Sequence, residues 1–307
     1  MVSGGSAFFV FISGFLFLTI YKSSTKYFDF LLKKIRFVYL PFLFFSSFEF
    51  FLIFLNMFIN FFTQTYKSQL YWDSLFNFDF ISIYLIGKSH LTSGIFWYVP
   101  FIMFIYLLSP IFLMYSRLRT NFRIYILLLS LLVSLFLFRD YTYELLSILH
   151  NVIYFLPFYL LGILSSQFEE ILYKKINNKI IIYFILLYFA VIFIRVIKPF
   201  SILIRVDLML LQKLFFCIIF LVYLKSVNSK NLSTIKILAT NSYGIFFIHA
   251  IILYLIRTLT SKLHIVYKTE SFLIYMAYAT VILFISLFAV LIIKRILGSR
   301  SKYFIGL

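Results

Sequence analysis

Three cations stand close together in FLLKKIRFVYLPFL, residues 30–43. Lys33 and Arg36 are three residues apart, so they share one face of any helix that forms there. An arginine guanidinium makes bidentate contacts to phosphate, and a lysine adds a compact positive charge. Together with Lys34, these side chains are suited to binding a phosphorylated ligand. The alternative is an ordinary basic loop beside a membrane.

Three other ionisable residues, Glu49, Lys213 and His249, lie inside long apolar runs. An ionisable group at membrane depth is costly, so each of them is a candidate for function. As alternatives, Glu49 and Lys213 pair with each other or reach an aqueous pocket, and His249 hydrogen-bonds between helices. Ser242 precedes His249 by seven residues, which places both on one helix face. This spacing predicts a polar stripe that faces the interior of a helix bundle.

A Ser-Gly pair interrupts the apolar stretch FVFISGFLFL, residues 9–18. Small residues let two membrane helices approach closely, and a serine hydroxyl hydrogen-bonds to a neighbouring helix. Ser13 and Gly14 therefore predict a close contact between helices, and packing alone is enough to account for the pair.

The composition indicates that these helices lie in a membrane. Of the 307 residues, 64% are hydrophobic and 12% are charged, and the mean hydropathy is +1.04. A soluble domain has about a quarter of its residues charged, so this chain fits an all-α, polytopic transmembrane bundle in the lipid bilayer. The net charge of +18 would suggest nucleic acid in a soluble protein. Here the cations gather in short loops, and no nucleic-acid partner is expected.

The chain has a single cysteine, Cys217. One cysteine excludes an internal disulfide and a cysteine-based metal site, and no bound metal is expected.

Nine apolar runs have the character of membrane spans, most of them near the ~20 residues that a bilayer core requires. They are residues 7–21, 37–64, 95–116, 122–138, 151–168, 180–197, 206–224, 237–257 and 271–293. We expect one transmembrane domain over residues 1–307 and no soluble domain. The longest loop, 65–94, is polar and aromatic. FDFISIYLIG within it is predicted to lie at the membrane interface or to re-enter the membrane.

The basic residues predict an orientation. Alternate loops, beginning with 22–36, carry 18 of the 28 lysines and arginines, whereas the opposite loops carry nine. The positive-inside rule then places the more basic loops and the C-terminus in the cytoplasm. An odd number of spans puts Met1 outside, which is the topology expected of a chain that lacks its first helix. Loop 195–205 is basic for an outer loop, so it is either a tolerated exception or a contact to an anionic ligand.

Five stretches, in order, resemble the acyltransferase family 3 membrane proteins, which include O-acetyltransferases of bacterial cell-surface polysaccharides. They are FFVFISGFL, FLLKKIRFVYLPFL, HLTSGIFWYVPFIMFIYLLSP, YFLPFYLLGIL and NSYGIFFIHAIIL. The best hallmark is the SGFL helix followed by the basic stretch from Lys33 to Pro41. Trp97 and the spacing from Ser242 to His249 fit as well. The resemblance covers nearly the whole chain.

The resemblance implies about ten helices in a bacterial inner membrane and an enzyme that moves an acyl group, commonly acetyl from acetyl-CoA, onto a sugar hydroxyl. Lys33 and Arg36 match the basic pair that the family uses to handle the acyl donor on the cytoplasmic side. Acyl-CoA is then a substrate, and no bound cofactor is expected. The implied partners are the bilayer, a glycan acceptor and proteins of polysaccharide biosynthesis.

The family's first helix carries a histidine thought to be catalytic, and this chain begins at the helix after it. The catalytic base therefore stays unassigned, and His249 does not match it because it lies on a different helix. Candidates for supporting roles are Ser13, Glu49, Trp97, Lys213, Ser242 and His249. The alternative functions are a polysaccharide exporter or flippase, a glycan polymerase, or an inactive, truncated acyltransferase.

Overall fold

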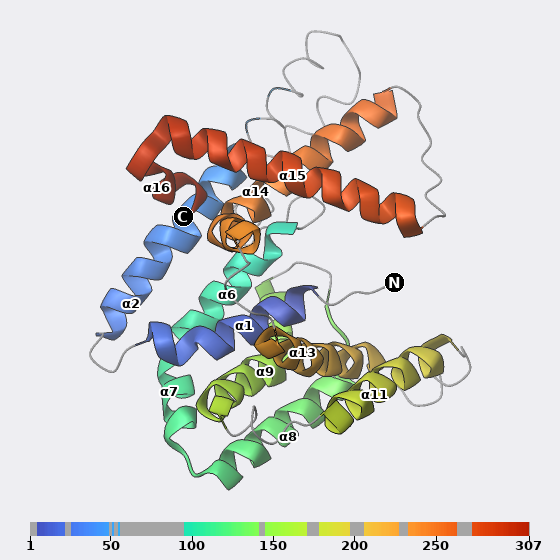
Figure 1. The fold of residues 1–307 in the computed structure, drawn as a ribbon. Coiled ribbons are helices and arrows are strands. Elements are labelled where there is room, and N and C mark those ends of the chain that lie inside the picture. The colour runs from blue at the N-terminus through green and yellow to red at the C-terminus, as the bar shows by residue number, and fades with distance from the viewer. Residues whose placement is uncertain are drawn as a thin grey trace. The chain divides into compact units, whose positions relative to one another are not determined.

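The structure is a computed structural model that describes residues 5–21, 26–48, 51, 55, 95–140, 145–170, 178–196, 206–226, 233–262 and 272–306. Every regular element within these ranges is helical, which confirms the all-α prediction for this part of the chain (Figure 1). The α-helices are α1 (Gly5–Ile20), α2 (Tyr27–Lys34), α6 (Tyr98–Leu107), α7 (Ser109–Arg117), α8 (Thr120–Phe136), α9 (Leu145–Gln167), α11 (Asn178–Val196), α13 (Leu208–Ser226), α14 (Ser233–Lys262), α15 (Phe272–Leu297) and α16 (Ser301–Ile305). Three short elements of other helical types are η1 (Ile35–Tyr39), η2 (Ile95–Trp97) and η4 (Gly298–Arg300).

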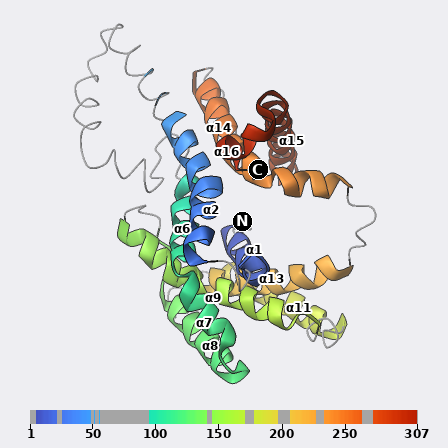
Figure 2. The same ribbon diagram turned by 90° about the vertical axis from the view of Figure 1, so that its left-hand side faces the viewer.

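The chain divides into two compact units, and each is described by itself. Unit 1 comprises Met1–Phe30, Phe104–Thr142 and Leu146–Asn231, and unit 2 comprises Leu31–Met103, Tyr143–Leu145 and Leu232–Leu307. Helices α11 and α13 lie side by side in unit 1, and α14 packs on α15 in unit 2 (Figures 1 and 2).

Most of the apolar runs predicted as spans form helices close to the expected bounds. Within the described ranges, α9, the segment Ile235–Ile256 and the segment Leu273–Ile305 are long and apolar enough to cross a membrane. The pair α6 and α7 passes the same test as one broken span. Helices α1, α8, α11 and α13 contain apolar segments of 10–17 residues. Beyond residue 48, only Phe51 and Leu55 of the second run are described, and loop 65–94 lies outside the described residues.

One predicted feature is wrong in detail. Loop 22–36 is not a loop throughout, because α2 begins at Tyr27 and helical backbone continues to residue 48. The predicted run 95–116 is helical but broken, because α6 and α7 are bent by 56° at Leu108. Pro110 stands in the first turn of α7, and a proline there has no backbone N–H with which to continue the preceding helix. The Tyr27 hydroxyl donates to the Leu107 carbonyl oxygen at 2.9 Å, next to this break.

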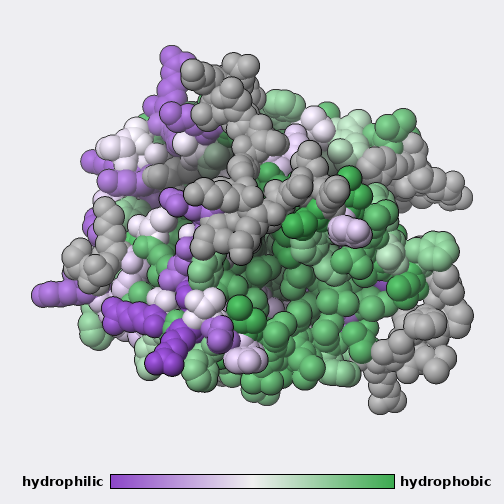
Figure 3. All heavy atoms as spheres, turned by 60° about the horizontal axis from the view of Figure 1, so that its bottom comes forward, coloured by the Kyte–Doolittle hydropathy of each residue, from purple (hydrophilic) through white to green (hydrophobic). Residues whose placement is uncertain are grey.

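The surface of the described residues carries large apolar side chains. Phe193 on α11, Leu273 on α15 and Ile296 on α15 are among those that are mostly exposed. Figure 3 shows hydrophobic side chains covering much of one face. Such extensive exposed apolar surface is expected of helices whose outer faces contact lipid.

In unit 1, α1 and α9 cross with their backbones in contact. A Cβ atom added at Gly14 would lie 3.0 Å from the Tyr159 carbonyl carbon, and one added at Gly162 would lie 2.7 Å from the Phe15 backbone nitrogen. Ser13, beside Gly14, shares a hydrogen bond of 3.3 Å with the Tyr106 hydroxyl on α6. The close helix contact predicted from the Ser-Gly pair is confirmed, and the helix that approaches Gly14 is α9.

The core of unit 2 is aromatic. The rings of Phe45 and Phe247 stack in parallel with their centroids 4.7 Å apart, and Phe96 packs on Phe247 at 5.4 Å. Helix α14 therefore contacts both the segment that follows η1 and the short element η2 that precedes α6.

Candidate functional site

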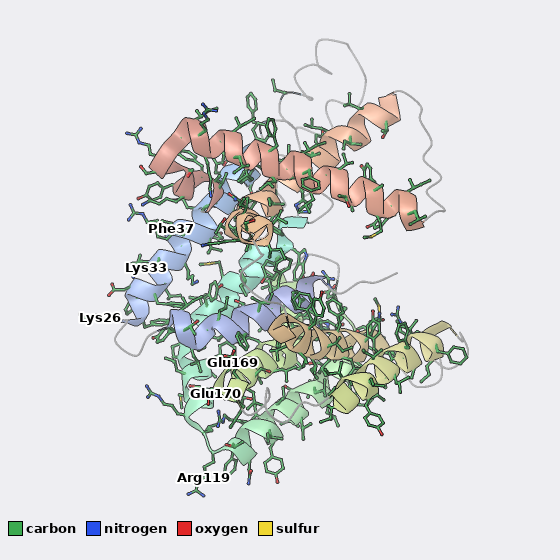
Figure 4. The ribbon with its side chains drawn as sticks, in the orientation of Figure 1. Lys26, Lys33, Phe37, Arg119, Glu169 and Glu170 are labelled. Atoms are coloured by element: carbon green, nitrogen blue, oxygen red, sulfur yellow. The ribbon has the colours of Figure 1, made fainter. Side chains whose placement is uncertain are left out.

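The backbone that carries Arg36 is a π-helical turn. The Leu40 N–H donates to the Ile35 carbonyl oxygen, so the helix of α2 widens through η1 before it continues to residue 48. Single π-helical turns inside α-helices occur frequently at functional sites. Lys33 and Arg36, the predicted basic pair, are both exposed along this segment. Figure 4 shows Lys33 and Phe37 in succession along it.

Arg36 is held by a tyrosine from the C-terminal segment. The Arg36 Nη2 donates to the Tyr303 hydroxyl at 2.9 Å, and the guanidinium carbon lies 4.7 Å from the centre of the Tyr303 ring. Phe37 stacks on the same ring, with centroids 5.9 Å apart and an interplanar angle of 21°. Lys302 Nζ lies 5.3 Å from the ring centre. We call Lys33, Arg36 and Lys302 the cationic surface.

No aspartate or glutamate occurs in the part of unit 2 that the structure describes. The cations on this part of unit 2 include Lys33, Lys34, Arg36, Arg300 and Lys302, and Asp29 lies four residues before Lys33 on α2. The cationic surface is chemically suited to an anionic ligand with several oxygens, because Arg36 uses one of its five N–H donors on Tyr303.

The other predicted residues of unit 2 do not form an interior stripe. His249 is half-buried, and its Nδ1 donates to the Ile245 carbonyl oxygen of its own helix at 3.0 Å. Ser242 is exposed, and its hydroxyl donates to the Ala239 carbonyl oxygen at 2.9 Å. The prediction that both face the interior is therefore wrong for Ser242, since the buried polar residue at that level of α14 is Asn241.

Trp97 is half-buried at the end of η2 and packs on Phe101, with ring centroids 5.4 Å apart. Its neighbour Phe96 is the side chain that enters the core of unit 2. Trp97 therefore packs where η2 joins α6. Glu49 lies outside the described residues, so its predicted pairing with Lys213 stays a prediction.

Unit 1 contains a buried polar network that sequence reasoning missed. The Tyr154 hydroxyl donates to Asp207 Oδ2 at 2.7 Å and accepts from Lys213 Nζ at 3.3 Å. The other carboxylate oxygen, Oδ1, accepts the Met209 backbone N–H at 2.9 Å, so Asp207 also caps the start of α13. Asp207, Lys213 and the Tyr154 side chain are all buried. Lys213 was a predicted site residue, and its polar neighbours are Tyr154 and Asp207.

Further cations flank this network. Arg195 donates through Nη1 to the side-chain oxygen of Gln212, next to Lys213 in sequence. Arg139 lies 5.6 Å from the centre of the Phe155 ring, and Lys213 Nζ lies 5.9 Å from it. Asp207 was not foreseen because an aspartate at the start of an apolar run is the ordinary N-cap signal. Tyr154 is one of 24 tyrosines in the chain, and nothing in its local sequence distinguishes it.

No group of three or more His, Cys, Asp or Glu side chains that could hold a metal ion occurs in the ranges that the structure covers. The lysines and the arginine of the cationic surface are suited to binding anions. In a comparison with protein families, an acyltransferase domain matches residues 2–294.

The chain belongs to acyltransferase family 3. The resemblance inferred from the five stretches is confirmed, and it covers both units. Neither the curated proteins nor the solved structures contain a significant match. This family 3 protein is a multi-pass membrane protein with transferase activity, which requires an acyl donor.

Proposed function

We propose that this family 3 protein transfers an acyl group, acetyl in the simplest case, from cytoplasmic acyl-CoA to a hydroxyl of a cell-envelope or exported polysaccharide. The hydroxyl oxygen attacks the thioester carbonyl, a C–O ester bond forms, the C–S bond breaks, and the CoA thiol leaves. A base takes the hydroxyl proton, and hydrogen-bond donors stabilise the oxyanion that develops. The base is not assigned to any described residue.

The observation that carries this proposal is the cationic surface of unit 2. CoA carries a diphosphate and a ribose phosphate, and a planar guanidinium beside lysines suits these groups. The described residues of unit 2 include no aspartate or glutamate, and Asp29 lies one helical turn before Lys33 on α2. The family supplies the need for an acyl donor, and the basic pair Lys33 and Arg36 supplies a place where one would bind.

The predicted orientation is compatible with a cytoplasmic donor. Loop 22–36, the start of α14 and the C-terminal tail are all assigned to the cytoplasm by the distribution of Lys and Arg. In unit 2 the corresponding elements touch one another: α16 contacts both η1 and α14, and the Tyr243 hydroxyl donates to the Val38 carbonyl oxygen at 2.8 Å. Segments that meet in this way belong on the same side of a bilayer, so the contacts support the proposed location of the donor site in the cytoplasmic leaflet of the inner membrane.

In this proposal the residues predicted to have supporting roles stabilise the two units and do not contact the acyl donor. Ser13 and Lys213 keep unit 1 assembled through Tyr106 and Tyr154. Trp97 and His249 shape the aromatic core of unit 2, and Phe246 lies 5.9 Å from the His249 ring. The acceptor glycan and the polysaccharide biosynthesis proteins that would deliver it are partners required by the proposed reaction.

The double substitution Lys33→Ala/Arg36→Ala tests the proposal. Hydrogen bonds to charged groups are worth about 1.5–3 kcal/mol each, so we expect the acyl content per sugar to fall at least tenfold. The measurement is the ester-linked acyl group released from purified surface glycan, relative to total sugar. The matched control is Arg117→Ala/Arg119→Ala, which also removes two exposed cations from the predicted cytoplasmic side. Figure 4 shows Arg119 at the start of α8.

The same experiment separates the alternative functions. An unchanged acyl content in the Lys33→Ala/Arg36→Ala strain, with normal protein level, would contradict the donor role of the pair. Loss of the glycan itself at constant acyl content per sugar would favour an exporter, a flippase or a polymerase.

A further inference from the structure

The C-terminal segment lies beyond the residues that match the acyltransferase domain, which end at 294. It nevertheless returns to the cationic surface, because α16 packs against η1 and α14. We infer that α16 completes the acyl-donor site: Tyr303 is a positioning residue for Arg36, and Lys302 adds a cation for the phosphates of CoA. This inference rests on the proposed function, since it takes Arg36 as a donor-binding residue.

The tail is anchored firmly enough to place a side chain. Ile305 is 1% exposed and belongs to the core of unit 2, and Ser301 is also buried. Phe304 packs edge-on against Phe44 with ring centroids 5.2 Å apart. These contacts lie on both sides of Tyr303 in sequence, so its ring is held from each end of the short helix.

Gly306 follows α16 and lets the backbone pack closely against η1. Its φ of +70° lies in the left-handed region that side chains other than glycine rarely adopt. A Cβ atom there would also lie 2.9 Å from the Phe37 carbonyl oxygen and would collide with the Tyr243 ring. Only glycine therefore fits at position 306, which packs against the Phe37 carbonyl oxygen, next to Arg36 in the sequence.

Tyr303 fixes Arg36 in two ways at once. Its hydroxyl accepts from Nη2 at 2.9 Å, and its ring lies under the guanidinium at 4.7 Å, which is within the range of a cation–π contact. Phe37 stacks on the ring and limits its rotation. An arginine held in this way loses less side-chain entropy when it binds phosphate, and a ligand then binds more tightly. Lys302, 5.3 Å from the same ring, brings a second charge to the same place.

The expected effect is on donor binding and not on the chemical step. Tyr303→Ala should raise the KM for acetyl-CoA and the Kd for CoA about tenfold, and leave kcat within about twofold. Tyr303→Phe, which keeps the ring and loses the hydroxyl, should raise both about threefold.

Lys302→Met should raise the Kd for CoA about threefold, because it removes one phosphate contact and keeps the apolar stem. In an Arg36→Ala background, Tyr303→Ala should change the Kd less than twofold, because there is no guanidinium left to position.

The measurement uses the full chain purified in lipid nanodiscs, with CoA as the binding probe and thermal unfolding as a check of the fold. The matched control is Tyr275→Ala, which removes a tyrosine of α15 that is 58% exposed and lies in the same unit. We expect the control to bind CoA normally.

The outcomes separate this inference from the proposed function. If Lys33→Ala/Arg36→Ala leaves the Kd for CoA unchanged, the proposed donor site is wrong. If that variant loses CoA and Tyr303→Ala binds it normally, only the role of α16 is wrong. Tighter CoA binding in Tyr303→Ala would also overturn the inference, since Tyr303 would then compete with the donor for Arg36. An equal effect of Tyr303→Ala with and without Arg36 would reduce Tyr303 to a structural residue.

Discussion

Substitution of Gly14 by alanine is expected to destabilise the folded protein by about 3 kcal/mol. The added Cβ would lie 3.0 Å from the carbonyl carbon and 3.1 Å from the Cα of Tyr159, and these are backbone atoms of α9 that cannot turn aside. The helices α1 and α9 would have to separate, which also strains the hydrogen bond of 3.3 Å between Ser13 and Tyr106. The measurement is the free energy of unfolding in mixed micelles, followed by tryptophan fluorescence.

The control for this prediction is Gly5→Ala on the same helix. Among the described residues, and apart from the chain neighbours and the backbone of its own helix, no atom lies within 4 Å of the Cβ that this substitution would add. Alanine has a better intrinsic helix propensity than glycine, so we expect Gly5→Ala to leave the stability unchanged or to raise it by a few tenths of a kcal/mol. Equal stability of the Gly14→Ala and Gly5→Ala proteins would show that α1 and α9 do not cross at these glycines.

A second glycine at the crossing makes the prediction sharper. A Cβ at Gly162 would lie 2.7 Å from the Phe15 nitrogen and 3.0 Å from the Gly14 carbonyl carbon. Gly162→Ala alone should therefore be about as costly as Gly14→Ala. The double substitution should cost clearly less than the sum of the two, because one separation of the helices relieves both clashes. Additive losses would place the two glycines in independent contacts.

The sequence predicts the fold best at positions where only one or two residue types can serve, such as a glycine at a close helix contact or a proline at a bend. Ser13 and Gly14 in an apolar run predict a close helix contact, and the structure has it. Gly162 belongs to YFLPFYLLGIL, so two of the five stretches that resemble the family meet at one backbone crossing. The bend at Leu108 was within reach of the sequence as well, since Pro110 cannot continue a preceding helix.

The sequence is least informative where function depends on which distant segments meet. Arg36 and Tyr303 are 267 residues apart, and nothing local to either indicates their hydrogen bond. The spacing of Ser242 and His249 is correct for one helix face, yet spacing does not decide which face the core covers. In α14 the stacking of Phe247 on Phe45 fixes the rotation of the helix, and Ser242 is exposed as a result.

Substitution of Asp207 by asparagine is expected to cost about 3–5 kcal/mol, which is typical when one member of a buried charge pair is lost. Asparagine has the same shape, but its amide cannot supply the negative charge near Lys213. It also presents a donor or a weaker acceptor to the Tyr154 hydroxyl, which now donates to the carboxylate at 2.7 Å. The measurement is the free energy of unfolding in mixed micelles. The matched control is Glu170→Gln, the same change of charge at an exposed residue just beyond α9, where we expect less than about 0.5 kcal/mol (Figure 4).

The partner substitution decides whether the charges or only the shape of the network matter. Lys213→Met removes the buried cation and keeps much of the apolar stem that lies over the Tyr154 and Phe155 rings. If the charge pair explains the loss, the protein with both Asp207→Asn and Lys213→Met should recover at least half of the stability lost by Asp207→Asn alone, because no unbalanced lysine then stays buried. If the double protein is as unstable as the sum of the two single losses, the Lys213 charge does not explain the cost, since asparagine at position 207 can still accept the Met209 N–H as an N-cap. Tyr154→Phe tests the hydroxyl itself, because it removes the group that bonds both Asp207 and Lys213 and leaves both charges in place.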